Sequence, residues 1–75
     1  MDEFRAIQRT KSYVEVVGQL RELIERGTLA PGQRLPPERE LAQRMGISRA
    51  TLREALAALE ILGYLQVVNG RGIFV

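Results

Sequence analysis

The two residue types that most often carry metal and nucleophilic chemistry are missing from this chain, whose 75 residues include no cysteine and no histidine. Without cysteine the chain has neither a disulfide framework nor a thiolate metal site, and without histidine the other usual zinc ligand is absent. The acidic residues are scattered, and no glycine-rich loop of the phosphate-binding kind is present. We therefore expect a chain that is not an enzyme and that holds no cofactor or metal.

Long apolar runs are also lacking. The first eleven residues already contain five charged side chains, at Asp2, Glu3, Arg5, Arg9 and Lys11. The sequence therefore predicts neither a signal peptide nor a membrane span. A chain of this length makes one small domain that buries only about 60% of its unfolded surface. We expect no second domain within it, and a reducing cytosol is compatible with the absence of cysteine.

Positive charge is concentrated in one stretch, although the net charge is only +2. Residues 28–53 contain five arginines and two glutamates, a local excess of three positive charges. The flanking stretches 12–27 and 54–75 each have one excess negative charge. A local excess of arginine is typical of a surface that binds nucleic acid.

Residues 45–62 carry the strongest local pattern. Ser48 is a favoured N-cap residue, and Gly63 stands where a C-terminal cap is wanted, which predicts a helix over residues 49–62. Arg49 and Arg53 lie on its polar side. Thr51 stands where a capping box would place Glu or Gln, so we expect the hydroxyls of Ser48 and Thr51 to be free to contact another molecule. The apolar stripe of this helix consists of Leu52, Ala55, Leu56, Leu59 and Leu62.

A shorter helix is predicted upstream, over residues 36–45, with proline in its first turn and Gly46 providing the sharp turn that follows. Two helices joined by a tight turn, the second longer and basic at its start, form a helix-turn-helix. A further helix is predicted from Ser12 until Gly27 ends it. Residues 1–11 show no period and are expected to be an N-terminal lead. The apolar face of the first helix comprises Tyr13, Val16, Val17, Leu20, Leu23 and Ile24.

The remaining segments favour β-structure. A Pro-Gly turn at residues 31–32 precedes three residues that can form a short strand. Residues 64–68 and 73–75 are rich in β-branched and aromatic side chains, and the Asn69-Gly70 pair between them is typical of a hairpin. The sequence thus predicts an α+β fold, a winged helix-turn-helix made of three helices and a C-terminal hairpin wing. The final residues lie inside a predicted strand, which indicates part of a longer protein.

Several segments resemble the N-terminal DNA-binding domain of GntR-family bacterial transcription regulators, in register over about residues 12–75. They are Gly27-Thr28-Leu29-Ala30-Pro31-Gly32, Leu35-Pro36-Pro37-Glu38-Arg39-Glu40-Leu41-Ala42, Gly46-Ile47-Ser48-Arg49, Leu52-Arg53-Glu54-Ala55-Leu56 and Asn69-Gly70-Arg71-Gly72-Ile73-Phe74-Val75. The Arg-Glu-Ala-Leu run is most similar to the subfamily that includes the fatty-acid regulator. Members of that subfamily carry an all-helical effector-binding domain after the wing.

The resemblance implies a sequence-specific reader of double-stranded DNA. Arg39 and Arg49 would read guanines in the major groove, which suits the bidentate fork of arginine. Ser48, Thr51 and Arg53 would hold phosphates or neighbouring base edges. At position 50 relatives carry a hydroxyl, so Ala50 would touch a thymine methyl or nothing. Asn69 and Gly70 would bring the wing to the minor groove, where Arg71 adds a charge.

The resemblance also implies a cytoplasmic, nucleoid-associated bacterial protein, acting as a homodimer, most often a repressor, on a palindromic operator. A small-molecule effector would bind a C-terminal domain that this chain does not contain. Two alternatives remain open on the residues alone. Arg39 could pair with Glu40 or Glu54 instead of contacting DNA. The whole domain could serve as a protein-interaction module, since one fold supports several functions. A third possibility is a continuation into an aminotransferase-like domain.

Overall fold

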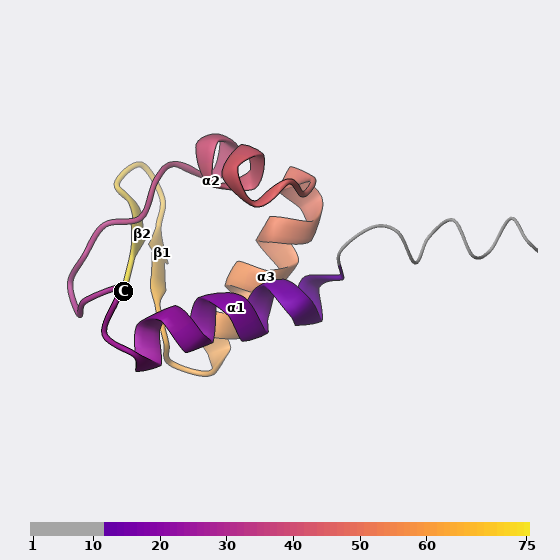
Figure 1. Cartoon of the computed structure of the whole chain (residues 1–75). Coiled ribbons are helices and arrows are strands. Elements are labelled where there is room, and N and C mark those ends of the chain that lie inside the picture. The colour runs from indigo at the N-terminus through magenta and orange to yellow at the C-terminus, as the bar shows by residue number, and fades with distance from the viewer. Residues whose placement is uncertain (1–11) are drawn as a thin grey trace, which may run out of the picture.

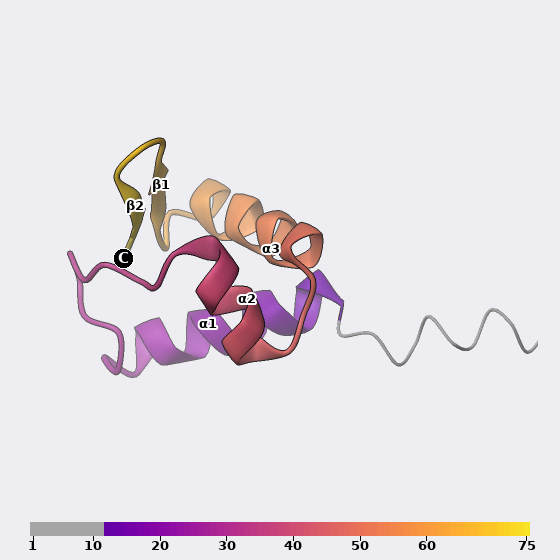
Figure 2. The ribbon, with the colours of Figure 1, turned by 90° about the horizontal axis from the view of Figure 1, so that it is seen from above.

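The computed structural model describes residues 12–75, and the expected lead of residues 1–11 lies outside them. Within the described residues the elements are α1 (Tyr13–Glu25), α2 (Glu38–Met45), α3 (Arg49–Ile61), β1 (Gln66–Val68) and β2 (Gly72–Phe74). Figure 1 shows the helices packed together with the hairpin at one end of the group, and Figure 2 shows the same arrangement from above. The expected order of three helices followed by a hairpin is confirmed.

The core lies where α1 and α3 pack against each other, with α2 and the hairpin covering it. Leu52 and Leu59 of α3 are completely buried, and Val16 of α1 is almost so. Two residues assigned to apolar stripes are nevertheless exposed, namely Tyr13 at 42% and Leu62 at 58%. Both lie at the helix ends, where the stripe extends past the elements that could cover it. The buried set is Val16, Leu20, Leu35, Leu41, Ala42, Leu52, Ala55, Leu56, Leu59, Leu65 and Ile73.

The second helix starts later than predicted. The sequence placed its first turn at residue 36, but α2 begins at Glu38, and Pro37 is its N-cap with extended backbone (φ −55°, ψ 152°). The physical reason is that a residue before proline is sterically driven away from the helical region, which keeps Pro36 extended. At the other end, Gly46 adopts the left-handed conformation (φ 68°) and closes α2, as expected.

The hairpin has a three-residue loop, because Val68 pairs with Gly72 across the antiparallel ladder. The predicted short strand after the Pro-Gly turn reduces to a single bridge between Arg34 and Phe74. Residues on both sides of Arg34 still form backbone hydrogen bonds with residues 73–75. The Gly32 amide donates to the Val75 carbonyl at 2.9 Å, and the Leu35 amide donates to the Ile73 carbonyl at 2.8 Å. These bonds attach the base of the wing to the segment that leads into α2.

Candidate nucleic-acid interface

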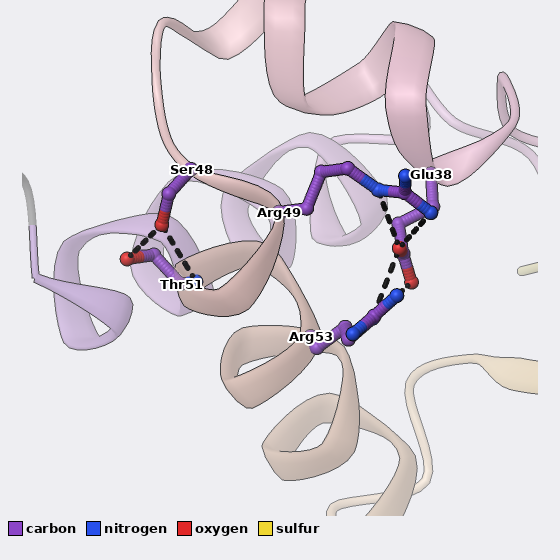
Figure 3. Close-up of polar contacts among 5 residues, drawn as sticks. All are labelled: Glu38, Ser48, Arg49, Thr51 and Arg53. Atoms are coloured by element: carbon purple, nitrogen blue, oxygen red, sulfur yellow. Dashed lines mark hydrogen bonds and ion pairs between the residues drawn. The ribbon is translucent and has the colours of Figure 1, made fainter.

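The start of α3 presents the polar residues that the sequence singled out. Ser48 is the N-cap with extended backbone, and its hydroxyl oxygen accepts from the Thr51 amide at 3.0 Å. The same hydroxyl donates to the Thr51 hydroxyl at 2.9 Å (Figure 3). The expectation that both hydroxyls are free is therefore wrong for Ser48, which caps the helix. Thr51 accepts that bond and keeps its own hydroxyl proton for an acceptor outside the chain.

Arg49 and Arg53 lie one helical turn apart on the exposed side of α3, and both bind the carboxylate of Glu38. The Arg49 Nε atom lies 3.0 Å from Glu38 Oε1, and its Nη2 atom lies 3.0 Å from the same oxygen. The Arg53 Nε atom lies 3.0 Å from Oε1 and 3.1 Å from Oε2. Figure 3 shows Glu38 held between the two guanidinium groups. A carboxylate on α2 thus joins two like charges on α3.

These contacts shape the electrostatics of the site. The hydrogen bond from Arg53, reinforced by the one from Arg49, holds the pKa of the Glu38 carboxyl below its ordinary value, although partial desolvation acts in the opposite direction. Glu38 is therefore ionised at neutral pH. The side chains of Arg49 and Arg53 remain 54% and 63% exposed, while that of Glu38 is 26% exposed. The two arginine side chains are thus more exposed than the carboxylate that lies between them.

The other arginines of the basic stretch differ in their environment. Arg39 is exposed, and within residues 12–75 it forms no ion pair with Glu40 or Glu54. Glu40 pairs instead with Arg44, one turn along α2. Ala50 is exposed beside Arg49. Arg39 and Ala50 are therefore accessible to a ligand, as a DNA-contacting role requires.

Asn69, Gly70 and Arg71 form the exposed tip of the wing. The Arg71 amide donates to the Val68 carbonyl at 3.0 Å, which closes a β-turn. Gly70 has φ +78°, but Asn69 does not have a positive φ. A positive φ at Gly70 alone is typical of a type II turn. The tight two-residue hairpin turn that an Asn-Gly pair favours would need a positive φ at Asn69 as well, and the loop here has three residues.

The wing and the helix-turn-helix face each other across a shallow groove of about 280 Å³. Glu38 and Pro37 line one side, and the wing tip with Arg71 lines the other. Arg34 also lines this groove, and its Nε atom is 2.8 Å from the position a Cβ on Gly72 would take. Glycine is favoured there by its φ of +126°, whereas the Arg34 guanidinium is the end of a flexible side chain and could move aside.

One residue of the site escaped the sequence reasoning. Glu38 appeared only as a favourable charge at a helix start, yet it contacts two residues that lie 11 and 15 positions further along the chain. A signal existed in retrospect. Two arginines four residues apart on a helix repel each other, and an acidic residue at the start of the preceding helix is well placed to bridge them.

The family model described as "Bacterial regulatory proteins, gntR family" matches residues 12–75. This chain belongs to the GntR family. Among curated GntR-family and related regulators, the Uxu operon transcriptional regulator of Escherichia coli K12 is 44% identical over 70 residues, which are 93% of this chain and 27% of that protein. The HTH-type transcriptional repressor NagR of Bacillus subtilis is 46% identical over 63 residues, 84% of this chain and 26% of that protein.

Solved structures agree with this family assignment. AraR(DBD) in complex with operator ORX1 superposes with a TM-score of 0.80 at 40% identity, over 84% of this chain and 76% of that one. YtrA from Sulfolobus acidocaldarius, a GntR-family transcription factor, gives 0.75 at 38% identity, over 84% of this chain and 66% of that one. The chain spans about a quarter of the length of the two curated relatives. Among the described residues, no helix is long and apolar enough to cross a membrane.

Proposed function

We propose that this chain is the operator-reading domain of a ligand-responsive bacterial transcription regulator. The observation that carries the proposal is the exposed pair Arg49 and Arg53 at the capped start of α3. A helix of this kind fits the major groove, where arginine recognises guanine through O6 and N7. The fold match to AraR(DBD), a structure with bound operator, supports the same mode of binding.

In this proposal the residues divide into two roles. Arg39 and Arg49 read guanines, and Ala50 faces the base edges. Ser48, Thr51 and Arg53 hold the phosphate backbone near the start of α3, with Ser48 acting through its cap of the helix. Asn69 and Gly70 bring the wing to the minor groove, and Arg71 extends a positive charge into it. Contacts of the second kind position the protein, whereas base contacts specify the sequence.

The complete protein extends the proposal. Operators of helix-turn-helix dimers are palindromic because two recognition helices bind half-sites about one turn of DNA apart. We propose that the complete protein is a homodimeric, cytoplasmic repressor with a C-terminal effector domain. The similarity to NagR, a transcriptional repressor, supports the repressor role. The rival role, a protein-interaction module, gives no reason for exposed arginines on both α3 and the wing tip.

The proposal is tested by selecting bound sequences from a random duplex pool and then titrating variants on the selected duplex and on random DNA. Arg49→Ala should lose about 1–3 kcal/mol on the selected duplex and relax the preference at one guanine. Arg53→Ala should weaken both DNAs evenly and reduce the salt slope by about one unit.

Arg21→Ala is the matched control, because it removes the same charge from an exposed position on α1. It should bind like the parent apart from a small electrostatic change. Enrichment of no common sequence by the parent chain would overturn the proposed function and favour the protein-interaction module. Equal losses on both DNAs for Arg49→Ala would remove that residue from base reading.

A further inference from the structure

Glu38 is the one acidic group among the described residues that contacts both Arg49 and Arg53. A carboxylate beside a DNA-binding surface repels phosphates, so simple charge matching would disfavour it there. The position of Glu38 at the first residue of α2 does not explain its contacts with α3, because an acidic residue there could interact favourably with the helix dipole without reaching α3. The contacts across the two helices therefore call for a separate reason.

The geometry of the contacts shows what Glu38 leaves available. Arg49 uses Nε and Nη2, the side edge of its guanidinium, on a single oxygen of Glu38. Each of its terminal nitrogens still holds an N–H at the far end of the group, and these two form the fork that matches guanine O6 and N7. Arg53 uses Nε alone, on both oxygens. Its two terminal nitrogens stay free for phosphate.

We propose that Glu38 is a positioning residue for DNA recognition, which stays bound to Arg49 and Arg53 on the DNA and directs their free N–H groups outward. This inference rests on the proposed function, and it assigns a role to Glu38, which is not among the residues proposed to contact DNA. Held in this way, Arg49 presents a fixed fork to a base pair and does not swing toward the nearest phosphate. Fixing a flexible side chain before binding reduces the entropy lost on binding.

The inference predicts opposite effects on the two kinds of DNA. Glu38→Gln keeps the shape of the side chain and removes the charge that holds the arginines. Affinity for the selected duplex should fall on the order of fivefold, the ratio that corresponds to one charge contact at a solvated surface. Affinity for random DNA should stay the same or rise, because the freed arginines can reach phosphates and the repelling carboxylate is gone.

Glu40→Gln is the matched control. Glu40 also lies in the first turn of α2 and also pairs with an arginine, but its partner Arg44 is on the same helix and not on α3. The control therefore changes the net charge and the helix dipole by the same amount. It should shift the affinities for both DNAs together, so that their ratio stays at the parent value.

The measurement is fluorescence titration of the 75-residue chain and its variants on the selected duplex and on random duplex, with thermal melts of each variant. A second arm repeats Glu38→Gln in the Arg49→Ala background, where no fork remains to be positioned. There Glu38→Gln should no longer reduce affinity for the selected duplex. A structural role for Glu38 would instead lower affinity by the same factor in both backgrounds.

The possible outcomes separate the two proposals. A parent chain that enriches no sequence overturns the proposed function, whatever Glu38 does. If the parent chain enriches a sequence, the ratio of the affinities for the selected and random duplexes tests the positioning role. A ratio for Glu38→Gln that equals the ratio for Glu40→Gln overturns the positioning role alone. A reduced ratio that disappears in the Arg49→Ala background supports it.

Discussion

The start of α3 and the tip of the wing both expose arginine, but they hold it in different ways. Arg49 and Arg53 are tied to α2 through Glu38 (Figure 3). Arg71 lies in a turn closed by a backbone bond, and within residues 12–75 no acidic side chain pairs with it. Reading a base edge requires a fixed direction, whereas attraction to a phosphate or a narrow groove requires mainly charge. The difference matches these two demands for Arg49, which the proposal assigns to a base, and for Arg71, which it assigns to the minor groove.

The largest expected effect comes from removing the support of α3. Leu52 is completely buried, whereas the side chains of Arg49 and Arg53 on the same helix are exposed. Leu52→Ala should reduce the free energy of unfolding by about 2–5 kcal/mol, through lost burial and the cavity left behind. In a domain this small the wing should unfold with the helices, in one transition followed by circular dichroism.

Ile61 provides the control for this substitution. It is an aliphatic residue of similar size on the same helix, but it is 86% exposed. Ile61→Ala should change the free energy of unfolding by no more than about 0.5 kcal/mol. Equal destabilisation by the two substitutions would mean that α3 is not seated on the core as described.

Much of this arrangement could be predicted from the sequence, because it depends on local patterns. The period of the leucines places α3, Ser48 and Gly63 mark its two ends, and Gly46 marks the end of α2. The exposure of Ile61 also follows from the helical period. These features rest on contacts and backbone preferences within a few residues, which a single sequence displays directly.

The parts that could not be predicted depend on how elements cross in space. The charge pattern is compatible with a bridge from Glu38 to Arg49 and Arg53, but the bridge forms only because α2 crosses the start of α3 at a particular angle, which no periodicity encodes. The sequence instead suggested Glu40 or Glu54 as partners for Arg39, whereas Glu40 binds Arg44. The φ signs of the wing turn likewise follow from the register of Val68 with Gly72, which is a property of the folded hairpin.

A smaller effect is expected from distorting the wing alone. Gly70 has φ +78°, a conformation that costs a residue with a Cβ about 1–2 kcal/mol. Gly70→Val should lower the melting temperature modestly and weaken DNA binding, with the helical circular dichroism spectrum of the folded state unchanged. Gly70→Asn is the control, since asparagine tolerates this region better, and it should lie between valine and the parent. A valine variant as stable as the parent would contradict the turn described here.

The smallest effect on stability is expected from Arg71→Ala. Because Arg71 has no ion pair within the described residues and projects from the wing tip, its removal should leave the thermal melt unchanged. Affinity should nevertheless fall, and it should fall most on operators with A·T-rich flanks, where the narrow minor groove concentrates negative potential. The measurement is a pair of titrations, on operators whose flanks are A·T-rich or G·C-rich.

Arg21→Ala supplies the comparison for Arg71→Ala, because it removes one exposed positive charge from α1. A loss that is equal for both variants and independent of the flanks would reflect net charge alone. A loss specific to Arg71 and larger on A·T-rich flanks would place the wing in the minor groove. If Arg71→Ala binds both operators like the parent, the wing acts as a structural hairpin, and recognition depends on the arginines that Glu38 holds at the start of α3.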